Sequence, residues 1–117
     1  ITQTGDDNNS KLTQSGTNDL ATIDQIGDFN RSTVTQLAGG LNNSVDVNQT
    51  GSEGLSEITQ SGTGNSVTLN QGGLDNDSFI TQAGSTNTAT VNQTGSDNIS
   101  TINQNGRGNT ATVTQGS

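Results

Sequence analysis

Branched aliphatic residues recur along this chain at intervals of mostly eleven residues, and each is followed two positions later by glutamine. Around them, inward and outward positions alternate with a period of two, as in residues 87–104, where NTATVNQ and NISTINQ flank TGSD. Such alternation is typical of β-strands that bury one face. The glycine of TGSD suits a tight turn. We therefore predict seven-residue strands at 87–93 and 98–104, joined by a turn, and copies of this unit along the rest of the chain.

The glutamines give the repeat its most regular marker. Successive glutamines are 11 residues apart, except for Gln36 and Gln49, which are 13 apart. Stacked strands allow each side-chain amide to pair with the same residue one rung away. We therefore predict a stacked glutamine ladder. Its members are Gln3, Gln14, Gln25, Gln36, Gln49, Gln60, Gln71, Gln82, Gln93, Gln104 and Gln115.

The position four residues before each glutamine doubles the period, because it alternates strictly between serine and a small aliphatic residue, as in Ser78, Ala89 and Ser100. The structural repeat is then 22 residues, with two strand types that form two walls. Within each wall, residues i and i+22 stack in parallel register about 4.8 Å apart. The aliphatic residues two before each glutamine should face each other across a thin core. One column is Leu12, Val34, Ile58, Ile80 and Ile102, and the other is Ile23, Val47, Leu69, Val91 and Val113.

These columns predict an all-β fold, a β-solenoid of 22-residue strand–turn–strand rungs stacked parallel and in register, as in a cross-β fibre. Residues 1–117 should form one domain of five full rungs and an N-terminal stub at 1–3. The two extra residues near 37–42 fall between strands, where a larger turn accommodates them.

Asparagine stands six residues before most glutamines, and we predict a second amide ladder there, since a buried amide needs a hydrogen-bond partner. Asp19 and Gly54 are the exceptions. The end rungs would keep unpaired backbone and amides, which offer a template to another copy. The ladder comprises Asn8, Asn30, Asn43, Asn65, Asn76, Asn87, Asn98 and Asn109.

Composition sharpens this picture. The chain has 117 residues, a net charge of −8 and only 23% hydrophobic residues, which is close to the composition of disordered chains. Order must then come from a repeat that buries many hydrogen bonds. The absence of proline leaves every backbone N–H able to pair. The chain begins at Ile1 without a leader, so we expect that an export signal was cleaved or left out.

Acidic residues gather in the turns that leave the aliphatic-type strands. The predicted acidic edge is Asp7, Glu53, Asp75 and Asp97. Neighbouring carboxylates one rung apart repel by roughly 1 kcal/mol in water. We interpret the row as a solvated edge that opposes lateral association. A second hypothesis is that low pH or divalent cations neutralise it and accelerate assembly.

The pattern Asn-x-(Ser/Ala)-x-(Ile/Val)-x-Gln-x-Gly, twice per 22 residues, resembles the repeat of curlins, the subunits of bacterial curli fibres. The resemblance covers essentially the whole chain. It implies a β-solenoid that is secreted and polymerises head to tail into an extracellular amyloid fibre at the cell surface, with roles in biofilm matrix and adhesion. It also implies a homopolymer, a nucleating subunit and secretion machinery as partners, and it places the family's stacking positions on the glutamine and asparagine columns.

Other functions find less support. Without His or Cys the usual nucleophile–base pairs cannot be built, so we expect no enzyme, no cofactor and no metal site. The three cations and the net charge disfavour nucleic acid. No apolar run is long enough for membrane insertion. The alternative is a monomeric solenoid that binds ice or glycan through outward threonines, although charges and Phe79 interrupt both outer faces.

Overall fold

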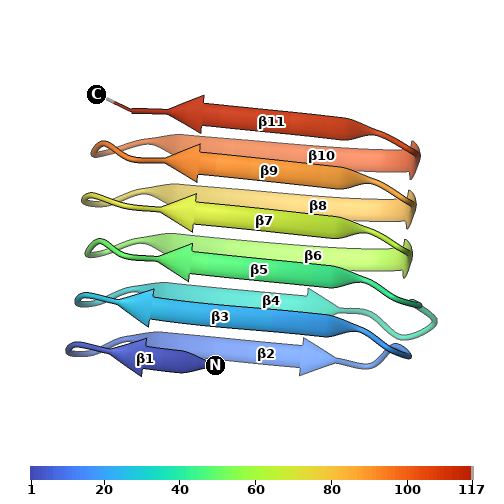
Figure 1. Cartoon of the computed structure of the whole chain (residues 1–117), viewed down its shortest axis with the longest axis horizontal. Helices are drawn as coiled ribbons and strands as arrows, with labels where there is room; N and C mark the ends of the chain where they lie inside the picture. Colours follow the sequence, from blue (N-terminus) through green and yellow to red (C-terminus); the bar gives the residue numbers. More distant parts are fainter. Residues whose placement is uncertain (117) are drawn as a thin grey trace.

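Eleven β-strands and no helix build residues 1–116, the part of the chain that the computed structural model describes. The strands alternate between two parallel sheets, so that odd-numbered strands form one layer and even-numbered strands the other (Figure 1). Sheet A contains β1 (Thr2–Thr4), β3 (Leu20–Ile26), β5 (Ser44–Gln49), β7 (Ser66–Gln71), β9 (Thr88–Gln93) and β11 (Thr110–Gln115). Sheet B contains β2 (Asn9–Gln14), β4 (Arg31–Gln36), β6 (Leu55–Thr63), β8 (Asp77–Ser85) and β10 (Ile99–Arg107).

The register follows the 22-residue repeat. Val91 pairs with Val113 in sheet A, and Ile80 pairs with Ile102 in sheet B. Each strand therefore lies on the strand of the same type one rung earlier. The predicted fold class, a β-solenoid with parallel, in-register strands, is confirmed. The domain predicted for residues 1–117 includes Ser117, which lies outside the described residues.

The larger turn at residues 37–42 leaves the columns aligned. Ile23 pairs with Val47 and Val34 pairs with Ile58, so the offset across this turn is 24 residues in both sheets. The extra residues bulge at one edge of the solenoid, between β4 and β5, as Figure 1 shows. A turn absorbs them because no ladder hydrogen bond depends on its length.

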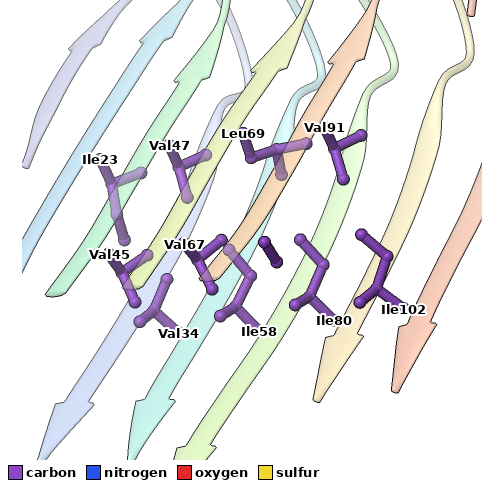
Figure 2. Packing of buried hydrophobic residues seen from close by; sticks show 11 residues of the cluster. Ile23, Val34, Val45, Val47, Ile58, Val67, Leu69, Ile80, Val91 and Ile102 are labelled. Carbon is purple, nitrogen blue, oxygen red and sulfur yellow. The ribbon is translucent and has the colours of Figure 1, made fainter. Parts of the chain in front are cut away.

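The hydrophobic core is a thin double row between the sheets (Figure 2). Ile23, Val47, Leu69 and Val91 project from sheet A toward the row that sheet B contributes. That second row is Val34, Ile58, Ile80 and Ile102. The solenoid is only 12 Å deep along its shortest axis, which matches two sheets stacked about 10 Å apart. Leu12 and Val113, in the outermost rungs, are half-buried.

At both edges of the solenoid, the turns contain residues in the left-handed region of φ/ψ space. At one edge the residues with φ between +54° and +59° are Asp7, Phe29, Glu53, Asp75 and Asp97. At the other edge Asn18, Asn42 and Thr86 share this conformation with Gly64 and Gly108. The left-handed region costs most L-residues roughly 1–2 kcal/mol, and Asn, Asp and Gly tolerate it best. Repeated turns of one shape explain why these residue types recur at fixed positions.

Candidate functional site

The glutamines form one hydrogen-bonded ladder in each sheet, and those from Gln25 to Gln104 are buried inside the solenoid. In sheet A, the Gln25 side-chain nitrogen Nε2 donates to Oε1 of Gln49 at 2.8 Å, and Gln49 donates in the same way to Gln71 at 2.8 Å. In sheet B, Gln60 donates to Gln82 and Gln82 to Gln104, both at 2.8 Å. The remaining steps join Gln3 to Gln25, Gln71 to Gln93, Gln93 to Gln115, Gln14 to Gln36 and Gln36 to Gln60, at 2.7–3.0 Å.

The same amides also tie the two sheets together, a contact that the sequence analysis missed. Nε2 of Gln82 donates to the backbone oxygen of Ser66 at 3.1 Å, and Nε2 of Gln104 donates to that of Thr88 at 2.9 Å. In both cases the acceptor lies 16 residues earlier, near the start of the preceding strand in the opposite sheet. A glutamine amide has two donor hydrogens and an acceptor oxygen. The ladder uses one hydrogen, and the cross-sheet bond uses the other.

The glutamine ladders have a direction. Every Nε2 donates toward the C-terminal end of the solenoid, from Gln3 at the first rung to Gln115 at the last. The first amides, Gln3 and Gln14, therefore present Oε1 atoms outward at the N-terminal end. The last ones, Gln104 and Gln115, each keep an N–H beyond the bond to the opposite sheet. One end of the solenoid thus presents acceptors and the other presents donors.

The asparagines bond differently from the predicted amide-to-amide ladder. The backbone N–H of Asn65 donates to Oδ1 of Asn43, and that of Asn87 donates to Oδ1 of Asn65, both at 3.0 Å. The Nδ2 group of Asn87 instead holds the turns, by donating to the backbone oxygens of Ala83 and Gly106. This pattern arises because the asparagine stands at the end of a turn, where nearby carbonyls compete for its amide. Asn8, Asn30, Asn76, Asn98 and Asn109 share all or part of it, and Asn98 alone adds a side-chain bond to Asn76.

Asp19 occupies an asparagine position and leaves a polar atom without a partner. Its Oδ1 accepts from the backbone N–H and from Nδ2 of Asn43. Its Oδ2 is shielded from solvent and makes no hydrogen bond. Oδ2 and the backbone oxygen of Gly40 both crowd the position that a Cβ atom on Gly16 would occupy. An asparagine amide in this place would donate to carbonyls, as the amide of Asn65 does to Ser61 and Gly84.

We therefore expect Asp19→Asn to stabilise the solenoid by about 1–3 kcal/mol, the cost of a buried polar group without a partner. Urea unfolding at neutral pH measures the effect. Asn43→Asp is the matched control, because it creates the same conflict at the next rung and should destabilise the fold. An Asp19→Asn variant that is less stable than the parent chain would contradict this account.

The serine column adds a further ladder in sheet B. Oγ of Ser56 donates to Oγ of Ser32 at 2.8 Å, and Oγ of Ser100 donates to that of Ser78 at 2.9 Å. The facing column of sheet A is aliphatic, with Val45 and Val67 buried against the core rows. The alternation seen in the sequence therefore corresponds to one partly polar wall and one apolar wall.

The acidic residues line one edge, where the turns stack through backbone hydrogen bonds. Asp7, Glu53, Asp75 and Asp97 are exposed, and Phe29 takes the corresponding position in the second rung.

Near this edge, burial and the charge of Asp75 raise the pKa of Asp77. The folded chain therefore binds this proton more tightly than the unfolded chain does. The contribution of Asp77 to stability increases as the pH falls toward and below its raised pKa.

The described residues offer little else on which chemistry could be built. They enclose no pocket, and no three acidic residues among them are close enough together to hold a metal ion. None of their elements is an apolar helix long enough to cross a membrane. The functional interpretation of residues 1–116 therefore rests on the ladders, the core columns and the end rungs.

Comparison with known families gives one match. The model of the curlin associated repeat matches residues 16–51, 57–84 and 84–116, which together make up most of the chain. A comparison with curated proteins finds no match. The matched segments begin in the turn before β3 and end with β11.

Proposed function

This chain belongs to the curlin repeat family, and on that premise we propose that it is a structural subunit of an extracellular, curli-like amyloid fibre. The fibre elongates end to end, as the last rung of one copy templates the first rung of the next. In this proposal, residues 1–117 act as one repeat domain at the cell surface and contribute to biofilm matrix and adhesion. The principal partner is another copy of the same chain. A nucleating subunit and a secretion apparatus complete the system, and no catalysis is involved.

The observation that carries the proposal is the complementarity of the two ends. Acceptor oxygens of Gln3 and Gln14 face one way, and donor N–H groups of Gln104 and Gln115 face the other. Two like ends would oppose donor with donor or acceptor with acceptor, whereas unlike ends oppose donors with acceptors. This polarity favours head-to-tail addition and a fibre with one direction.

Apolar surface at the ends supports the same mode of growth. Val113 is half-buried in β11 while its column neighbour Val91 is fully buried. Addition of a rung would cover Val113 and complete the backbone pairing of β11. Strand addition of this kind draws affinity from main-chain hydrogen bonds and specificity from side chains in register.

We expect the purified protein, held at micromolar concentration, to form unbranched fibres after a lag, with a cross-β reflection at about 4.7–4.8 Å. Val113→Asp should abolish this growth, because each added rung would bury an unpaired charge. The free subunit should still fold, since Val113 is only half-buried there. Electron microscopy, an amyloid dye and circular dichroism measure growth and folding separately.

Thr112→Asp is the matched control for this experiment. Thr112 is the exposed neighbour of Val113 on β11 and projects away from the core, so the same charge at this position should leave elongation largely intact. If parent protein stayed soluble and dye-negative at these concentrations, or if both variants grew equally well, templating by the end rung would be wrong.

The second candidate function, binding of a hydroxyl-rich surface such as ice or a glycan by the monomer, rests on the outer face of sheet A. In β7, β9 and β11 every outward residue is Ser, Thr or Asn, and the charges Asp24 and Asp46 are confined to β3 and β5. A monomer with this role would show no concentration-dependent conversion into sedimentable β-structure.

A further inference from the structure

The outer face of sheet B carries charges that are separated along the solenoid axis. Two of its three cations lie on the first two strands, Lys11 on β2 and Arg31 on β4, and the third, Arg107, lies at the far end of β10. Its anions lie on the next two, Glu57 on β6 and Asp77 on β8. The parallel register places Lys11, Thr33, Glu57 and Phe79 in one column. Near the starts of the strands, this face is therefore positive on β2 and β4 and negative on β6 and β8.

The column beside it combines charge with apolar surface. Arg31, Leu55, Asp77 and Ile99 stand in register. Ile99 is 63% exposed, and Leu55 and Phe79 are half-exposed. Isolated apolar residues on a surface need no explanation. Leu55 and Phe79 lie among the charged positions of β4, β6 and β8, so this part of the face is both charged and apolar.

We propose that two filaments of this protein pair laterally through the outer faces of sheet B, with their axes antiparallel. The inference rests on the proposed fibre, because it concerns filaments that have already grown. A two-fold axis parallel to the strands, between β4 and β6, places β4 of each subunit opposite β6 of its partner and β2 opposite β8. Arg31 then lies one outward position from the partner's Glu57, and Lys11 one outward position from the partner's Asp77. Long side chains span such diagonal separations.

The alternative, parallel pairing places like charges at the same level. A two-fold axis along the solenoid would set the β2 strands against each other and the β6 strands against each other, so that cations would face cations and carboxylates would face carboxylates. Like-charge juxtaposition costs several kcal/mol at an interface. The antiparallel arrangement is isologous, so each favourable contact occurs twice.

The area of contact explains why this pairing belongs to filaments rather than to single subunits. Four overlapping strands, at about 4.8 Å per strand and about 3.3 Å per residue, cover roughly 400 Å² of each copy. The total of roughly 800 Å² lies below the 1,000 Å² or so of a specific protein–protein interface. A filament repeats the patch at every subunit, and the linked contacts add to an effective affinity that one copy lacks.

The test compares filaments grown from the parent protein and from charge-reversal variants, with filament width measured by electron microscopy. The pairing predicts that parent filaments are double at low ionic strength and separate at about 1 M salt, where charges are screened beyond about 3 Å. Lys11→Glu/Arg31→Glu filaments, and Glu57→Lys/Asp77→Lys filaments, should each stay single, with about half the parent width. A mixture of these two filament types should pair again, and the fourfold variant that exchanges all four charges should pair with itself.

The matched control is Asp24→Lys/Asp46→Lys, which changes the net charge by the same amount as Glu57→Lys/Asp77→Lys but on the outer face of sheet A. It should leave pairing intact. Double filaments of either sheet B variant, or failure of the mixture to pair, would overturn the proposal. Parent filaments that form but stay single at low salt would contradict the pairing alone. A parent chain that forms no filament, with no cross-β reflection, would contradict the proposed function and the pairing with it.

Discussion

Replacing Ile80 by aspartate should prevent residues 1–116 from folding into the solenoid. Ile80 is 1% exposed and lies between Ile58 and Ile102 in the sheet B row of the core (Figure 2). The change removes about 2–5 kcal/mol of burial and packing and leaves a charge that no buried cation can pair, at a further cost of about 3–5 kcal/mol. Small domains are stable by only about 5–15 kcal/mol. We expect circular dichroism to show loss of β-structure and urea unfolding to show no cooperative transition.

Thr81→Asp provides the comparison on the same strand. Thr81 is the next residue and is exposed, so its variant adds the same charge in water rather than in the core. We expect its unfolding free energy to stay within about 1 kcal/mol of the parent value. Equal losses from the two variants would contradict the assignment of inward and outward positions on β8.

The contrast with Val113→Asp distinguishes folding from assembly. Ile80 is covered by rungs on both sides within one chain, whereas Val113 has a covered side and an open side. The same substitution should therefore abolish folding at the centre of the column and abolish only elongation at its end. A repeat protein allows this comparison because the chemistry of each column is constant while the number of neighbouring rungs changes.

The amino-acid sequence predicted the columns well because each depends on position alone. The spacing of the glutamines fixes the register, and the alternation of Ser78, Ala89 and Ser100 separates the two walls. A strand has a period of two, so an error of one residue would have moved Ile80 and Val91 to the outside. The longer spacing between Gln36 and Gln49 was predicted equally well as a larger turn, since a two-residue insertion in a turn shifts no column.

Hydrogen-bond partners were less predictable, because a column does not say which atoms of its members meet. The asparagines were expected to pair through their amides, as the glutamines do. Their place at the turn ends instead brings Asn87 Nδ2 to backbone oxygens and Asn65 Oδ1 to a backbone N–H. The cross-sheet bond of Gln82 depends on the distance between the walls, which no periodicity encodes. Asp19 was visible as an exception in its column, but its unpartnered oxygen needed coordinates.

Gly84→Ala should destabilise the solenoid strongly, although it adds only one methyl group. Gly84 has φ +100°, a conformation that L-residues rarely adopt, and a Cβ atom there would collide with the backbone oxygen of Gly106 in the turn above. Backbone atoms of stacked turns cannot move apart without breaking the ladders on both sides. Strain of about 1–3 kcal/mol and overpacking of about 1–3 kcal/mol add to a loss of about 2–6 kcal/mol, measurable by urea unfolding.

Gly106→Ala separates the effect of backbone strain from that of overpacking. It also tests the role of this turn in assembly. Gly106 has φ +118°, so alanine meets similar backbone strain, but the nearest atom to its Cβ would be Nδ2 of Asn109 at 3.6 Å, an ordinary contact. We expect this variant to lose only the strain contribution in the free subunit. In a fibre, the turn of the next copy would lie above Gly106 and recreate the collision, so elongation should slow even though the subunit folds. Equal unfolding free energies for the two alanine variants would show that close stacking of the turns is not what requires glycine.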